Sequence, residues 1–195
     1  MRSHDHRSPW RAAVVGVVVG IGIAGALLLT GCRGTTPAPD AAASVDPSKP
    51  TVVAAFYPLA YAAQRIGGDG VTVVNLTPPG VEPHDLELSA TQVAQIAEAD
   101  LVLYVPGFQP AVDEAVAQQA PDRALDVTEG LRLLNGPDGA TDPHVWLDPK
   151  AMTAVGSAVA SRLAEVPESN AASIAAGATS LASDLEALDA EYSAA

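Results

Sequence analysis

Residues 51–76 read TVVAAFYPLAYAAQRIGGDGVTVVNL, and this stretch decides the fold. It begins with a short apolar, β-branched run at 51–55, which is typical of a buried strand. Pro58 can open a helix, and that helix is expected to continue to Ile66, where two glycines follow. A second β-branched run occupies 71–76. Strand, helix and strand in this order predict a right-handed crossover between two parallel strands.

The same alternation continues along the chain. Ser89, with Gln92 three residues later, is the signature of a capping box and predicts a helix that runs to Ala99. The further expected elements are strands at 101–105 and 124–127 and helices at 110–119 and 149–165. This pattern predicts an α/β fold, with a parallel four-stranded sheet flanked by helices. Ligands bind such sheets beyond the carboxyl ends of the strands, so the loops at 77–87 and 135–143 are candidate site loops.

Residues 168–195 predict a different element. Apolar or small residues recur at alternating intervals of three and four: Ala171, Ile174, Ala178, Leu181, Leu185, Leu188 and Tyr192. This spacing is typical of one face of a long helix, and we expect that face to be exposed in the chain as it stands. Two interpretations remain open, a coiled-coil arm or a connecting helix that leads to a further domain.

Residues 1–31 have the composition of a secretory signal, because three arginines precede an uninterrupted apolar run at 12–29. The run ends in Leu-Thr-Gly-Cys, which resembles the bacterial lipobox, so Cys32 is the expected lipidation site. A plain transmembrane anchor with an incidental cysteine is the alternative. Residues 32–50 are rich in threonine, proline, alanine and aspartate and predict a flexible tether.

The composition limits the classes of function. The 195 residues include 10 lysines and arginines and 23 aspartates and glutamates, for a formal charge of −13, which argues against a nucleic-acid partner. A single cysteine excludes an internal disulfide framework and any multi-cysteine zinc site. The sequence contains no GxxxxGK[ST], HExxH or GxSxG motif, so neither a P-loop enzyme nor the hydrolases that use those motifs are indicated.

Two histidines lie in loops that follow predicted strands. His84 is part of PGVEPHDLELS at 79–89, and His144 is part of DPHVWLDP at 142–149. Each histidine follows a proline, which restrains the backbone, and lies beside acidic residues that can accept its second ring N–H. Two imidazoles suit zinc or another borderline divalent ion. Both histidines are therefore candidate metal ligands, with ordinary loop histidines as the alternative.

These motifs resemble those of a known family. The His84 loop and the helix after it, the segment ADLVLY at 99–104 and above all DPHVWLDP at 142–149 are similar to the N-terminal half of the zinc/manganese-type solute-binding proteins of bacterial ABC importers. The resemblance implies that His84 and His144 are the first two ligands of Zn²⁺, or alternatively Mn²⁺. It also implies that 51–167 form a first lobe and 168–195 a backbone helix, with further ligands in a second lobe.

The resemblance further implies a lipid-anchored receptor on the outer face of the bacterial cytoplasmic membrane. It would pass its ion to an ABC permease and would not be an enzyme. The alternatives are a metal-independent interaction protein that uses the long helix, and a metallohydrolase with Glu82, Asp85 or Glu87 as its base. We expect Trp146 to pack behind the second loop, and Phe108 is a weaker candidate to line the cleft.

Overall fold

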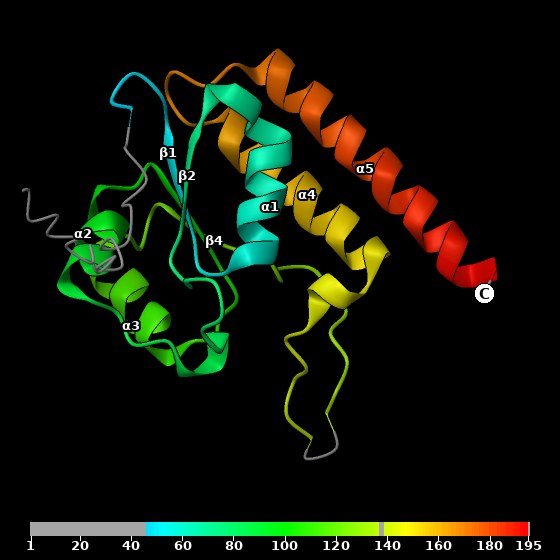
Figure 1. The fold of residues 1–195 in the computed structure, drawn as a ribbon, viewed down its shortest axis with the longest axis horizontal. Coiled ribbons are helices and arrows are strands. Elements are labelled where there is room, and N and C mark those ends of the chain that lie inside the picture. The colour runs from blue at the N-terminus through cyan, green and yellow to red at the C-terminus, as the bar shows by residue number, and fades with distance from the viewer. Residues whose placement is uncertain (1–45, 137–138, 195) are drawn as a thin grey trace, which may run out of the picture. The chain divides into compact units, whose positions relative to one another are not determined.

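A computed structural model describes residues 46–136 and 139–194 (Figure 1). The expected signal peptide, Cys32 and most of the expected tether lie outside the described residues. The strands are β1 Thr51–Ala54, β2 Thr72–Asn75, β3 Leu101–Tyr104 and β4 Ala124–Asp126. The α-helices are α1 Tyr57–Gly67, α2 Ala90–Glu98, α3 Pro110–Gln119, α4 Pro149–Ala164 and α5 Ala171–Ala194. Short 3-10 turns are η1 Gly68–Gly70, η2 Pro83–Asp85 and η3 Val145–Leu147.

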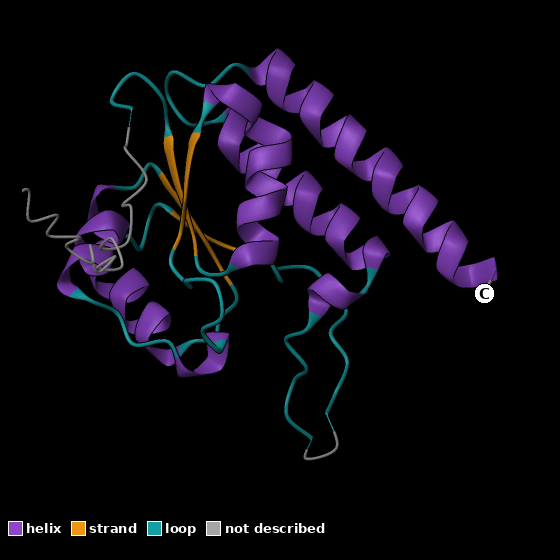
Figure 2. Cartoon of the chain, in the orientation of Figure 1, coloured by secondary structure: helices purple, strands orange, loops and turns teal. Residues whose placement is uncertain are grey.

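The four strands form one parallel sheet in the order β2-β1-β3-β4, with Val52 opposite both Val73 and Leu101. Helix α1 packs on one face beside α4, while α2 and α3 cover the other face (Figure 2). The central strands are almost completely buried because helices cover both faces. The prediction of a parallel four-stranded α/β sheet is confirmed. The order reverses between β1 and β3, which makes the carboxyl ends of these two strands the natural position for a site.

Local sequence signals explain where the helices begin and end. The side chain of Ser89 accepts the backbone N–H of Gln92, and the Gln92 side chain accepts the N–H of Ser89, so the predicted capping box is present. Asp148 caps α4 by accepting the N–H of Lys150 at 2.8 Å. Helix α1 ends before Gly68, whose φ of 53° suits a residue without a Cβ.

Helix α5 lies across the outer side of α1 and α4, where Ile174 and Leu181 are buried. Leu188 and Tyr192, near the other end of the same stripe, are exposed. The expectation that the whole stripe is exposed is therefore wrong for its first half. That half is covered because α1 and α4 supply an apolar surface within the same domain. Among the helices that the structure describes, none combines the length and apolar character needed to cross a bilayer.

A glycine sets how closely α5 approaches α1. A Cβ at Gly177 would lie 2.8 Å from the carbonyl oxygen of Arg65 and closer still to that of Ile66. These are backbone atoms and cannot move aside as a flexible side chain would. Two ion pairs also hold α5, one from Arg65 of α1 to Asp184 at 2.5 Å and one from Lys150 of α4 to Asp189 at 3.0 Å.

Candidate metal site

The two predicted histidines meet at the carboxyl edge of the sheet. His84 lies in η2, after the edge strand β2, and His144 directly precedes η3, after the opposite edge strand β4. Their ring centroids are 5.7 Å apart, although sixty residues separate them in the sequence. Both residues are exposed to solvent. The fold thus brings the two imidazoles together where an ion could contact both.

Aromatic side chains form the floor beneath the two imidazoles. Phe56 follows β1 and Phe108 follows β3, and both are almost completely buried. Phe108 contacts the His84 ring edge-on at a centroid distance of 4.4 Å and lies 6.1 Å from the His144 ring. Trp146 closes the cluster at 5.0 Å from His144 and 4.7 Å from Phe56. This apolar floor keeps water from one side of both rings and limits their movement.

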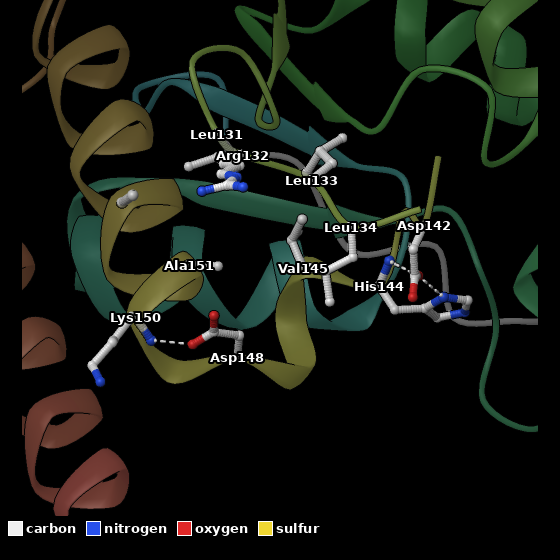
Figure 3. A pocket seen from close by; sticks show the side chains of 11 residues that line it. Leu131, Arg132, Leu133, Leu134, Asp142, His144, Val145, Asp148, Lys150 and Ala151 are labelled. Carbon is white, nitrogen blue, oxygen red and sulfur yellow. Dashed lines mark hydrogen bonds and ion pairs between the residues drawn. The ribbon is translucent and has the colours of Figure 1, made fainter. Parts of the chain in front are cut away.

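His144 is oriented by a carboxylate in its own loop (Figure 3). The Oδ1 atom of Asp142 accepts the backbone N–H of His144 at 3.0 Å and lies 2.6 Å from its Nδ1 atom. The backbone N–H of His144, and after it the imidazole, lower the pKa of Asp142 below its ordinary value. Asp142 therefore acts as an ionised acceptor that occupies Nδ1, which leaves Nε2 available for a metal ion.

His84 is held differently. Its backbone N–H donates to Oε1 of Glu82 at 3.4 Å, a long hydrogen bond. In the part of the chain that the structure describes, no carboxylate bonds to the His84 ring. Glu82, Asp85 and Glu87, the candidate bases of the metallohydrolase alternative, are all exposed. The ring of His84 lies edge-on against Phe108 and beside the ring of His144.

The described residues do not extend this pair to a larger set of ligands. Across 46–136 and 139–194, no group of three or more His, Cys, Asp or Glu side chains is arranged to hold a metal ion. Two imidazoles fill about half of a tetrahedral zinc shell. His84 and His144 can therefore supply two nitrogen ligands, and the remaining coordination positions of the ion are left to water or to other groups.

A pocket of about 300 Å³ adjoins the half-site on the side of His144. It lies between residues 131–134 and the start of α4, and its lining includes Leu131, Leu134 and Lys150. Figure 3 shows the His144 ring pointing away from the leucines and from Arg132. Asp142 and His144 also line this pocket, so it borders the half-site, although the His144 ring points away from the leucines.

The sequence did not point to two residues at this edge, Phe56 and Gln109. Phe56 could have been predicted, because an aromatic residue just after a buried central strand lies at the edge of the sheet where sites form. Gln109 is a buried glutamine beside Phe108 and gave no signal, because a single glutamine is ordinary in a loop. Trp146 packs on the aromatic floor beside the second loop, as expected. Phe108, the weaker candidate, lies at the centre of that floor.

The chain is similar in sequence to known proteins. The model of the family described as zinc-uptake complex component A, periplasmic, matches residues 52–195. The manganese-binding lipoprotein MntA of Bacillus subtilis (strain 168) is 34% identical over 124 residues, covering 60% of this chain and 39% of that protein. The high-affinity zinc uptake system protein ZnuA of the same strain is 30% identical over 116 residues, covering 50% of this chain and 36% of its own length.

The fold matches solved structures of the same kind. Zn(II)-bound AdcA from Streptococcus pneumoniae superposes with a TM-score of 0.67 at 27% identity, covering 74% of this chain and 32% of that one. The chain thus spans well under half the length of these three relatives. The resemblance found in the sequence, and the fold class that it implied, are both confirmed.

Proposed function

Because this chain belongs to the periplasmic zinc-uptake complex component A family, we propose that it is a substrate-binding lipoprotein of a bacterial metal ABC importer. It captures Zn²⁺, with Mn²⁺ as the alternative substrate, and delivers the ion to a membrane permease. The observation that carries the proposal is the approach of His84 and His144 to a centroid distance of 5.7 Å.

Zinc is favoured over manganese by the chemistry of the pair. Imidazole nitrogen suits zinc, whereas manganese prefers carboxylate and other oxygen ligands. Asp142 orients His144 in the manner common for metal-bound histidines, through its second ring nitrogen. The named relatives include both a zinc and a manganese protein, so the choice rests on the ligands rather than on the family.

The missing ligands belong, in this proposal, to a second lobe. Residues 51–167 act as the first lobe, and 168–195 act as the helix that connects it to the second. Burial of Ile174 and Leu181 against α1 and α4 supports a connecting helix over a free coiled-coil arm, because half of the stripe is already occupied. The same burial reduces the apolar helix face that would be available to a partner if the protein were a metal-independent interaction protein. We propose no catalytic activity for the protein, and the named relatives are a manganese-binding lipoprotein and a zinc uptake system protein.

The proposed location is the outer face of the cytoplasmic membrane. Residues 1–31 serve as the signal peptide, Cys32 carries the lipid and 32–50 form the tether. Removal of residues 1–31, which hold three arginines and one aspartate, leaves 7 basic and 22 acidic residues and a formal charge of −15. This charge repels anionic lipid, so a covalent anchor would hold the protein at the membrane. Replacement of Cys32 by serine should abolish incorporation of labelled fatty acid and release the protein from the membrane fraction.

The metal proposal is tested by thermal unfolding of the full chain in detergent with EDTA, Zn²⁺ or Mn²⁺. Zinc should raise the midpoint by several degrees, because an ion that binds only the folded state stabilises it. His84→Ala/His144→Ala should lose this shift. His4→Ala/His6→Ala, which removes the other two histidines of the uncleaved 195-residue chain used in this test, is the matched control and should keep it. An unchanged shift in the first double variant would overturn the proposal.

A further inference from the structure

Two buried polar side chains lie side by side beneath the His84 loop. Thr77 and Gln109 are the only polar side chains classed as buried within 46–136 and 139–194, with exposed fractions of 6% and 2%. They are bonded to each other, since Nε2 of Gln109 donates to Oγ1 of Thr77 at 3.1 Å. A buried polar pair in an otherwise apolar core is costly unless its hydrogen bonds are made, so its contacts show what it holds.

The pair joins the ends of three strands to the His84 loop. The Thr77 hydroxyl donates to the carbonyl oxygen of Ala55, directly after β1, at 2.8 Å. The second N–H of the Gln109 amide donates to the carbonyl oxygen of Pro83 at 2.9 Å. Gln109 follows β3, Thr77 follows β2 and Pro83 directly precedes His84. One side-chain amide thus connects the rigid edge of the sheet to the peptide bond that carries His84.

We propose that Gln109 is a positioning residue for His84, holding its loop at the distance from His144 that the metal ion requires. The inference rests on the proposed function, in which His84 is a ligand. Phe108 and Gln109 are successive residues, and they act on the same loop at two points. Phe108 contacts the His84 ring, and Gln109 holds the carbonyl just before it.

The chemistry of the amide suits this task. Nε2 carries two N–H groups, and the structure directs one to a hydroxyl and the other to a carbonyl. A methionine has nearly the same shape and no donor. Gln109→Met therefore removes both hydrogen bonds and keeps most of the volume.

The test is a zinc titration of the full chain in detergent, using Zn²⁺ alone as the probe. Gln109→Met should weaken zinc binding at least tenfold, the usual effect of losing a group that orients a ligand. The matched control is Gln118→Met, which changes an exposed glutamine on α3 whose Nε2 donates to Glu114. It should leave zinc affinity unchanged.

The same variant in two ligand-deficient backgrounds separates positioning from a general loss of structure. In His84→Ala the Gln109→Met change should have no further effect on zinc affinity, whereas in His144→Ala its effect should persist. The unfolding midpoint should fall by a similar amount in every background. An equal loss of affinity with and without His84 would overturn the inference, as would no loss at all in the wild-type background.

A substitute variant and a comparison with His84→Ala cover the other possible results. If Gln109→Met does not fold, Gln109→Asn takes its place, because the shorter side chain keeps an amide but withdraws it from Pro83. It should show the same dependence on His84, and independence of His84 would count against the inference. If His84→Ala itself leaves zinc affinity unchanged, the proposed function fails. If His84→Ala weakens binding and Gln109→Met does not, only the present inference fails.

Discussion

The two histidine loops reach the same place but are held by different means. The His144 loop contains its own orienting group, since Asp142 bonds both the backbone N–H and the ring of a residue two positions later. The His84 loop is held from a distance, by Gln109, which lies 26 residues after its partner Pro83, and by Phe108. One half of the site is locally encoded, and the other depends on the packed sheet. Damage to the sheet should therefore affect His84 first.

The largest effect on stability and zinc binding is expected at Phe108, because its ring lies against both histidine loops. Phe108→Ala removes a buried ring that contacts both imidazoles. It should lower the free energy of unfolding by about 3–5 kcal/mol, measured by urea denaturation. Zinc affinity should also fall in the protein that remains folded. Phe108→Leu, which keeps part of the volume, should do less on both measures. Unchanged zinc affinity in folded Phe108→Ala would show that the floor does not position the rings.

The locally encoded half is tested by a pair of conservative changes. Asp142→Asn removes the charge that orients His144 and should weaken zinc binding by about 10- to 100-fold in a calorimetric titration. Glu82→Gln alters the corresponding acid of the other loop, whose contact with the His84 N–H is 3.4 Å long. It should change zinc affinity little. Equal losses from the two variants would contradict the difference described above.

A change far from both loops should separate stability from binding. Gly177→Ala places a methyl group against the Arg65 and Ile66 carbonyls and forces α5 away from α1. Such overpacking costs about 1–3 kcal/mol, and alanine recovers about 1 kcal/mol through helix propensity, so a net loss of up to about 2 kcal/mol is expected. Gly156→Ala meets only the Leu181 side chain, at 3.2 Å, and should cost less. Zinc affinity should be unchanged in both folded variants. A loss of affinity in either would mean that the half-site responds to α5.

The smallest effect concerns the turn before Phe108. Burial raises the pKa of Asp113 above its ordinary 3.8, and the N–H of Gly107, which donates to it at 2.9 Å, partly opposes this. Ionised Asp113 therefore slightly destabilises the folded state. Relative to Asp113→Asn, the wild-type protein should become more stable as the pH falls through the raised pKa. This gain should stop below 3.8, where the unfolded chain is protonated as well. Urea midpoints across this range would show it, and the opposite slope would refute it.

Most of the fold could be predicted because its signals are local. The β-branched runs, the Ser89–Gln92 box and Pro149 each depend on neighbours in the sequence, and the elements they predicted are present within a few residues. The burial of Ile174 and Leu181 could not be predicted. Periodicity identifies an apolar face, but which surface covers that face depends on how distant helices pack.

The same distinction between local and long-range features applies to the site. His84 and His144 were predicted from their Pro-His settings, and the structure brings them together, while their role as metal ligands stays a prediction. Asp142 could be anticipated because a nearby acid is a local feature. Gln109 could not, since its partners Thr77 and Pro83 come from another part of the chain and only the folded sheet brings them within reach.

The origin of the two histidines in loops after the opposite edge strands has a consequence for chain entropy. An unfolded chain that chelated one ion with both residues would have to close a loop of sixty residues. The length-dependent part of that closure costs about 3–4 kcal/mol. In the folded protein the sheet already holds the two histidines close together, so this entropy has been lost before the ion binds. Two-point chelation is therefore far stronger in the folded chain than in the unfolded one, and zinc should act as a selective stabiliser of the finished fold.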